Sequence, residues 1–367
     1  MKTYVLLSLA LLLSVSGICQ STLNRPQTPT PPFYYHIEEV TFENTKDSVT
    51  LAGTLTFPKD GNNFPVAVLI SGSGAQNRNE ELVGHKLFWV LADYLAKQGI
   101  AVLRYDDRGT AASTGNFKTA LTQDFATDVE AAVDFLKTRT EFNQKAIGLI
   151  GHSEGGIIAP MVASDHPEDI GFIILLAGVT IPFDDLMKLQ KELSLRAMGS
   201  SESYIEQEVL FDNELMPVIT TTPLDELAEN LKTFTTAYLE KNPKFAKNRG
   251  MHAETYTNLV VSSYTSPWLY NLLNYDPAEA LKNTKCPILA LNGENDTQVP
   301  SKENLQALEQ LKSAYPEKNI TTKSYPKLNH LFQESVTGSV FEYGKIEQTI
   351  APYVLVEISS WIHTVVK

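Results

Sequence analysis

Two kinds of hydrophobic pattern divide this chain. Between residues 38 and 57 apolar and polar residues alternate, most clearly in 49–57, and this predicts half-buried antiparallel strands. After Pro65 the strand-like segments become continuous apolar runs, which are typical of parallel strands buried on both faces. These runs are residues 66–70, 101–103, 146–150, 172–176 and 288–291.

Segments with helical periodicity lie between the apolar runs. They cover approximately residues 82–98, 121–138, 153–163 and 302–315. Alternating strands and helices predict an α/β fold, with a mostly parallel central sheet flanked by helices and joined by right-handed crossovers.

The alternation stops between residues 181 and 276. Helical patterns such as 183–198 and 224–239 occur there, without any buried-strand run. We therefore expect a helical cap at 181–276, inserted into a core made of 37–180 and 277–367.

The N-terminus has the order of a secretory signal peptide. Lys2 precedes the apolar run 5–13, which small residues follow, and this predicts a signal peptide at residues 1–19. The run is too short to span a bilayer, and no later segment reaches the ~20 apolar residues that a span requires. The rival interpretation is a lipoprotein acylated at Cys19, against which Ile18 argues, because that position normally holds a small residue. A Pro/Thr-rich linker is expected at 20–36, and the protein is expected to be secreted or periplasmic.

Composition limits the possible partners and cofactors. The net charge of −13 gives no electrostatic case for nucleic acid or an anionic membrane as a partner. Removal of the signal peptide would leave Cys286 as the only cysteine, so the core must hold the fold without an intrachain disulfide. The spacing of His and Cys residues predicts neither a metal site nor an organic cofactor.

The strongest chemical signal is Gly151-His152-Ser153-Glu154-Gly155, which directly follows the apolar run 146–150 and opens a helix. In a G-x-S-x-G elbow the serine lies on a strained turn, and glycines two positions before and after it avoid a clash. This predicts Ser153 as a nucleophile, whereas His152 is expected to have a packing role.

A serine nucleophile needs a base and an acid that orients the base. The polar turn 292–300 follows the run 288–291, and Asp296 is the predicted acid, with Glu294 as the alternative. His330 is the predicted base, which gives the chain order Ser, acid, His that G-x-S-x-G hydrolases show.

An oxyanion hole must stabilise the charge that develops on the carbonyl oxygen. One donor is expected to be the backbone N–H of Glu154. The other is expected from the glycine-containing loop 71–76, at Ser73, or alternatively at Gly74 or Ala75. No Lys follows this loop at the position that a phosphate loop requires, which argues against a nucleotide site.

These segments resemble bacterial α/β-hydrolases of the serine aminopeptidase-like branch, which also contains cinnamoyl and feruloyl esterase-like enzymes. The resemblance covers about residues 38–366, and its matching pieces are 71–78, 104–109, 151–156, 293–299 and His330. It implies the α/β-hydrolase fold, the triad Ser153–Asp296–His330, and Ser73 with Glu154 at the oxyanion hole. Ser71 stands where many relatives have His, and Thr110-Ala111-Ala112 replaces a more glycine-rich turn, so a relative's substrate cannot simply be carried over.

The sequence therefore predicts an exported serine hydrolase that cleaves carboxylic esters through an acyl-serine intermediate. Trp268 and Tyr270, at the end of the cap, are candidates for substrate binding, with core packing as the alternative. An aminopeptidase or dipeptidyl-peptidase-like hydrolase of short peptides is the first rival, and would need a cap carboxylate to hold a free amino group. The cap has several acidic residues, which a solvated acidic face explains equally well. A non-catalytic binding protein on a hydrolase scaffold is the second rival.

Overall fold

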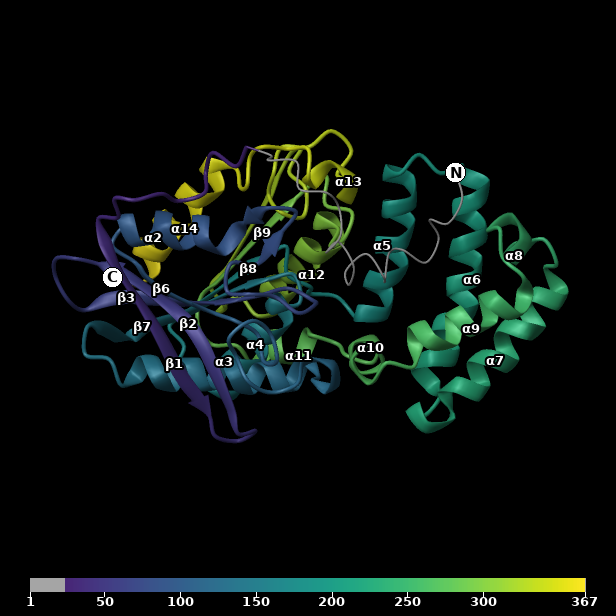
Figure 1. The fold of residues 1–367 in the computed structure, drawn as a ribbon, viewed down its shortest axis with the longest axis horizontal. Helices are drawn as coiled ribbons and strands as arrows, with labels where there is room; N and C mark the ends of the chain where they lie inside the picture. Colours follow the sequence, from purple (N-terminus) through teal and green to yellow (C-terminus); the bar gives the residue numbers. More distant parts are fainter. Residues whose placement is uncertain (1–23, 367) are drawn as a thin grey trace. The chain divides into compact units, whose positions relative to one another are not determined.

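The computed structural model describes residues 24–366 (Figure 1). Within them, Pro182–Asp276 form one compact unit, and residues 24–181 together with 277–366 form another. The predicted signal peptide, including Cys19, lies outside the described residues. Export and the alternative acylation of Cys19 therefore stay predictions.

An eight-stranded sheet forms the centre of the larger unit, in the order β1-β2-β6-β3-β7-β8-β9-β10. β2 pairs antiparallel with both β1 and β6, whereas all other neighbours are parallel. The strands are β1 (Tyr35–Asn44), β2 (Val49–Pro58), β3 (Phe64–Ile70), β6 (Ala101–Tyr105), β7 (Phe142–His152), β8 (Phe172–Leu176), β9 (Ile288–Gly293) and β10 (Ile320–Tyr325). This mostly parallel sheet confirms the predicted fold class.

Continuous apolar strands are needed because the sheet has a hydrophobic core on each face. In β3, Val66, Val68 and Ile70 contribute to one core, whereas Ala67 and Leu69 contribute to the other. The first core lies under helices α3 (Thr122–Lys137) and α4 (Gly155–Asp165), and the second under α2 (Leu87–Lys97) and α14 (Pro352–Val365) (Figure 1). Each fully buried Leu, Ile or Val side chain contributes about 1.5–3 kcal/mol to the stability of such a core.

The helices of this unit are α2 (Leu87–Lys97), α3 (Thr122–Lys137), α4 (Gly155–Asp165), α11 (Ala278–Asn283), α12 (Ser301–Ala314), α13 (Val340–Tyr343) and α14 (Pro352–Val365), with a 3₁₀ turn at Phe117–Thr119. Four of them, α2, α3, α4 and α12, correspond to predicted segments, whereas α11, α13 and α14 were not predicted. The prediction of a helix from residue 82 was wrong at its start. Two short strands, β4 (Glu81–Leu82) and β5 (His85–Lys86), form a hairpin there, and Gly84 in its turn has a φ of 83°.

The smaller unit contains helices only. They are α5 (Phe183–Ala197), α6 (Glu202–Thr221), α7 (Leu224–Lys241), α8 (Phe245–Asn248), α9 (Ala253–Tyr264) and α10 (Pro267–Leu273). None of the helices in the described part of the chain has the length and apolarity needed to cross a bilayer.

A buried cluster of charges lies inside the helical unit. Lys191 contacts both Glu208 and Asp212 at 2.8 Å, and the Arg249 guanidinium also pairs with Glu208. A solvated acidic face, one of the two interpretations of the acidic residues, therefore does not account for Glu208 and Asp212, which are almost fully buried. Five further acidic residues of the helical unit are exposed: Glu202, Glu206, Glu214, Asp225 and Glu226.

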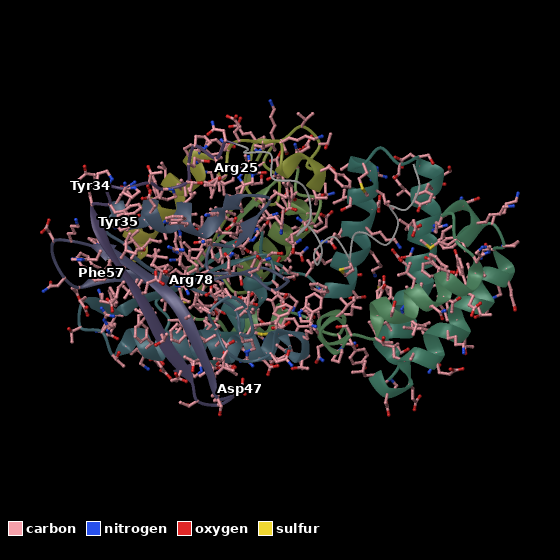
Figure 2. All side chains as sticks on the ribbon, in the orientation of Figure 1. Arg25, Tyr34, Tyr35, Asp47, Phe57 and Arg78 are labelled. Carbon is pink, nitrogen blue, oxygen red and sulfur yellow. The ribbon has the colours of Figure 1, made fainter. Side chains whose placement is uncertain are left out.

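The described part of the predicted linker is hydrogen-bonded to the larger unit. Arg25, labelled in Figure 2, donates to the carbonyl oxygens of Val83, Gly344 and Ile346 at 2.7–3.0 Å. Gln27 donates to the carbonyl of Ile350 and accepts hydrogen bonds from the N–H groups of residues 349 and 350. Two polar side chains thus hold this segment against the segment that precedes α14.

Candidate active site

The predicted site residues follow the C-terminal ends of parallel strands. Because β3, β7, β9 and β10 run in the same direction, their C-terminal ends meet at one edge of the sheet. Open α/β sheets bind their ligands at this edge. Ser153 follows β7, Asp296 follows β9, and His330 follows β10.

Ser153 lies on a strained turn between β7 and α4. Its φ of 53° is in the left-handed region, which side-chain-bearing residues rarely adopt. The hydroxyl-bearing side chain is half-buried, whereas the residues on either side of it are buried. Strain of this kind at a partly accessible serine is typical of a nucleophile elbow.

The two glycines of the elbow allow backbones to approach closely. A Cβ on Gly151 would lie 2.0 Å from the carbonyl oxygen of Gly155, and a Cβ on Gly155 would lie 2.2 Å from that of Ile70. Both distances are far below any tolerated contact. The requirement for glycine predicted from the motif therefore has a direct steric cause.

The structure brings Asp296 and His330 together. Asp296 Oδ2 lies 2.8 Å from His330 Nδ1, and both side chains are buried. Asp296 Oδ1 accepts two more hydrogen bonds, from the N–H groups of Gln298 and Val299. These fix the carboxylate, so the His330 ring donates from Nδ1 and leaves Nε2 as the basic nitrogen of the neutral form. Glu294, the alternative acid, is exposed and accepts a hydrogen bond from Ser324.

The loop after β3 packs directly against Ser153. A Cβ on Gly72 would lie 3.1 Å from Ser153 Cβ, which places the loop backbone beside the serine. Ser73 Oγ donates to Glu154 Oε2 at 2.7 Å, and Thr122 Oγ1 donates to the other carboxylate oxygen. The two predicted oxyanion residues, Ser73 and Glu154, are therefore joined through their side chains.

Three buried carboxylates hold this loop in place. Besides Glu154, Glu80 accepts from the N–H of Gly72 at 2.8 Å, and Asp107 accepts from Ser71 Oγ and from the N–H of Gln76. Burial raises the pKa of Asp107 well above its usual range, and the neighbouring negative charges of Glu80 and Glu154 act in the same direction. A loop fixed at several successive positions keeps its backbone amides in a defined orientation.

A small pocket opens between this loop, the elbow and β6. It is lined by Ile70, Ser71, Gly72, Gly74, Tyr105, Asp107, Phe125, Glu154 and Ile158. The pocket lies entirely within the larger unit, beside the loop that contains Ser73.

His152 and Glu80 form a pair beside Ser153 that no sequence pattern predicted. His152 was expected only to pack, but its ring nitrogens lie 2.8 Å from Glu80 Oε1 and 3.0 Å from the carbonyl oxygen of His330. Its ring also packs against that of His330, with 4.7 Å between the ring centres. The only local signal was a histidine next to the predicted nucleophile Ser153, since Glu80 lies 72 positions away from His152 in the sequence.

Trp268 and Tyr270 lie in α10 of the helical unit, where both are half-buried. The Tyr270 hydroxyl donates to the carbonyl oxygen of Thr222 at 3.1 Å, so it supports the end of α6. Their role in substrate binding stays a prediction. Across residues 24–366, no group of three or more His, Cys, Asp or Glu side chains is arranged to hold a metal ion.

A mostly parallel sheet flanked by helices, with a strained serine at a strand–helix elbow, defines an α/β hydrolase. Residues 86–334 match the family described as serine aminopeptidase, S33, and the chain belongs to this family.

Known relatives agree with this classification. Esterase EstD of Thermotoga maritima is 25% identical over 329 residues, which cover 89% of this chain and 69% of EstD. The Pyrococcus furiosus esterase PF2001 has a similar fold, with a TM-score of 0.53 and 15% identity, over 95% of this chain and 99% of that one. Est1E from Butyrivibrio proteoclasticus, solved with ferulic acid, gives a TM-score of 0.50 and 15% identity, over 89% and 99% of the two chains.

Proposed function

We propose that this protein is an exported serine esterase in which Ser153, His330 and Asp296 form the catalytic triad. The observation that carries this proposal is the 2.8 Å contact between Asp296 and His330, at the same sheet edge as the Ser153 elbow. A carboxylate bound to Nδ1 leaves Nε2 to accept the proton of a serine hydroxyl.

The proposed reaction has two halves. Ser153 Oγ attacks the carbonyl carbon of the ester while its proton passes to His330 Nε2, and the charge that develops on the carbonyl oxygen is stabilised by the N–H groups of Glu154 and Ser73. His330 then protonates the leaving alkoxide, which gives an alcohol and an acyl-serine. A water molecule attacks the acyl group by the same route, and the carboxylic acid is released.

Two considerations favour an ester over an amide as substrate. Among known proteins, the relative EstD is an esterase. An ester also has a better leaving group than an amide, whose nitrogen must be protonated before the bond breaks. We therefore infer that the substrate is a carboxylic ester of a small molecule.

A peptidase is the second candidate, and the description of the matching family supports it. An aminopeptidase needs an unpaired carboxylate to hold the positive amino terminus of its substrate. The two buried carboxylates of the helical unit, Glu208 and Asp212, are already paired with Lys191 and Arg249. This pairing weighs against Glu208 and Asp212 as an amine anchor.

A panel of substrates distinguishes an esterase from a peptidase. We expect p-nitrophenyl esters of short to medium chain length to be cleaved with a kcat/KM far above that of aminoacyl and dipeptidyl anilides. The Ser153→Ala variant is the control for background hydrolysis. Strong anilide cleavage that disappears when the substrate is N-acetylated would establish the aminopeptidase instead. Absence of Ser153 labelling by a fluorophosphonate probe would favour a non-catalytic binding protein.

A further inference from the structure

His152 is a buried histidine that the proposed reaction does not use. Its side chain is 4% exposed and that of its partner Glu80 is 6% exposed. The same oxygen, Glu80 Oε1, contacts His152 Nδ1 and accepts the N–H of Gly72, both at 2.8 Å. On the other side of the ring, Nε2 lies 3.0 Å from the carbonyl oxygen of His330.

These contacts bear on which ring nitrogens of His152 carry a hydrogen. The His330 carbonyl oxygen can only accept, so Nε2 of His152 must carry a hydrogen. Glu80 Oε1 also accepts from Gly72, and an ionised Glu80 accepts from Nδ1 of His152 as well. Beside an ionised Glu80 both ring nitrogens donate, and a ring with two N–H groups is an imidazolium.

We propose that His152, held as an imidazolium by Glu80, is a positioning residue that fixes the backbone of His330 relative to the oxyanion loop. The proposal rests on the proposed function, because it assigns the ion pair a task at the same site. The pair bridges two segments that must keep a fixed separation, since Gly72 precedes the oxyanion residue Ser73 and His330 carries the base. Displacements of about 1 Å at such positions can reduce turnover about 100-fold.

The titratable residues that face His152 come from three segments. They are Glu80 from the segment before β4, His330 from the loop after β10, and Asp296 from the loop after β9. Burial opposes the charge on His152, but Glu80, the His330 carbonyl and Asp296 outweigh it and raise the pKa of His152. Because this pKa is raised above the usual value of about 6.5, the stabilisation by the pair is complete below about pH 6.5. It is lost as the pH rises through the raised pKa.

NMR titration of the histidine ring nitrogens tests the protonation state directly in the wild-type protein, with His152→Gln used to assign the signals. We expect both His152 nitrogens to carry hydrogens at pH 6.5, with a titration midpoint above that value. In Glu80→Gln the midpoint should fall by about one pH unit or more. A wild-type midpoint below 6.5, or one that Glu80→Gln leaves unchanged, overturns the proposal. The wild-type titration requires no variant, so it decides the matter even if Glu80→Gln does not fold.

Kinetics with p-nitrophenyl butyrate test the positioning role. Glu80→Gln should lower kcat about 10-fold or more and leave KM within about twofold, since the pair does not touch the substrate. The matched control is Asp128→Asn, which removes a carboxylate of similar burial from its pair with Arg108. The Asp128→Asn control should lower thermal stability without lowering kcat. An equal loss of kcat in Glu80→Gln and Asp128→Asn would show that the Glu80–His152 pair has only a structural role.

Fluorophosphonate labelling of wild-type Ser153 separates the two proposals. If Ser153 is labelled and Glu80→Gln keeps its kcat, only the positioning role fails. If Ser153 is not labelled, the proposed esterase function fails, whatever the state of His152.

Discussion

Replacing Gly155 by alanine tests whether close backbone contact at the elbow positions the oxyanion loop. The added Cβ would lie 2.2 Å from the carbonyl oxygen of Ile70 and 2.9 Å from that of Ser71. Ordinary contacts begin at 3.4 Å, so α4 and the loop must move apart by about 1.2 Å. Both contacts are to backbone atoms, which no side-chain rotation can relieve. A displacement of that size should lower kcat about 100-fold, and the overpacking should cost about 1–3 kcal/mol of stability.

The assay combines kcat and KM on p-nitrophenyl butyrate with a thermal melt. Gly99→Ala is the matched control, because Gly99 has a φ of 85° but nothing within 4 Å of the added Cβ. It should cost about 1–2 kcal/mol through backbone strain and leave kcat unchanged. Wild-type kcat in a folded Gly155→Ala protein would refute the argument that this contact positions the loop.

Two further predictions concern the triad and export. Ser153→Ala or His330→Ala alone should remove nearly all turnover, because the triad acts as a unit, and Asp296→Asn should cost less but still orders of magnitude in kcat. Near-normal activity of Asp296→Asn together with loss of activity in Glu294→Gln would contradict the choice of acid. For export, the intact mass of the purified mature protein should correspond to a chain that begins at Gln20, whereas a lipid adduct on Cys19 would identify a lipoprotein.

Much of the sheet could be predicted from the sequence because its signal is local. A run such as Val66–Ile70 is apolar throughout, since its alternate residues enter two different cores. The elbow could be predicted for the same reason, as strand, glycines, serine and helix follow one another within a few residues. The order of the strands in the sheet could not be predicted from the sequence, because it depends on pairings between segments far apart in the chain, such as β9 with β8.

The supporting contacts of the site depend on long-range geometry as well. His152 meets the His330 carbonyl across 178 positions, and Ser73 meets Glu154 across 81. Neither pair produces a periodicity or a motif. The acidic residues of the helical unit show the same limit, because the composition of α6 does not reveal that Glu208 faces Lys191 rather than solvent.

The hydrogen bonds of Arg25 determine when, during synthesis, the segment around Arg25 can make its native contacts. The guanidinium binds the carbonyl oxygen of Ile346, 321 positions later in the chain. At a synthesis rate of about 5–20 residues per second, the ribosome needs about 16–64 s to add the intervening residues. Arg25 therefore leaves the ribosome long before Gly344 and Ile346 exist, and its set of hydrogen bonds is complete only when translation is almost finished.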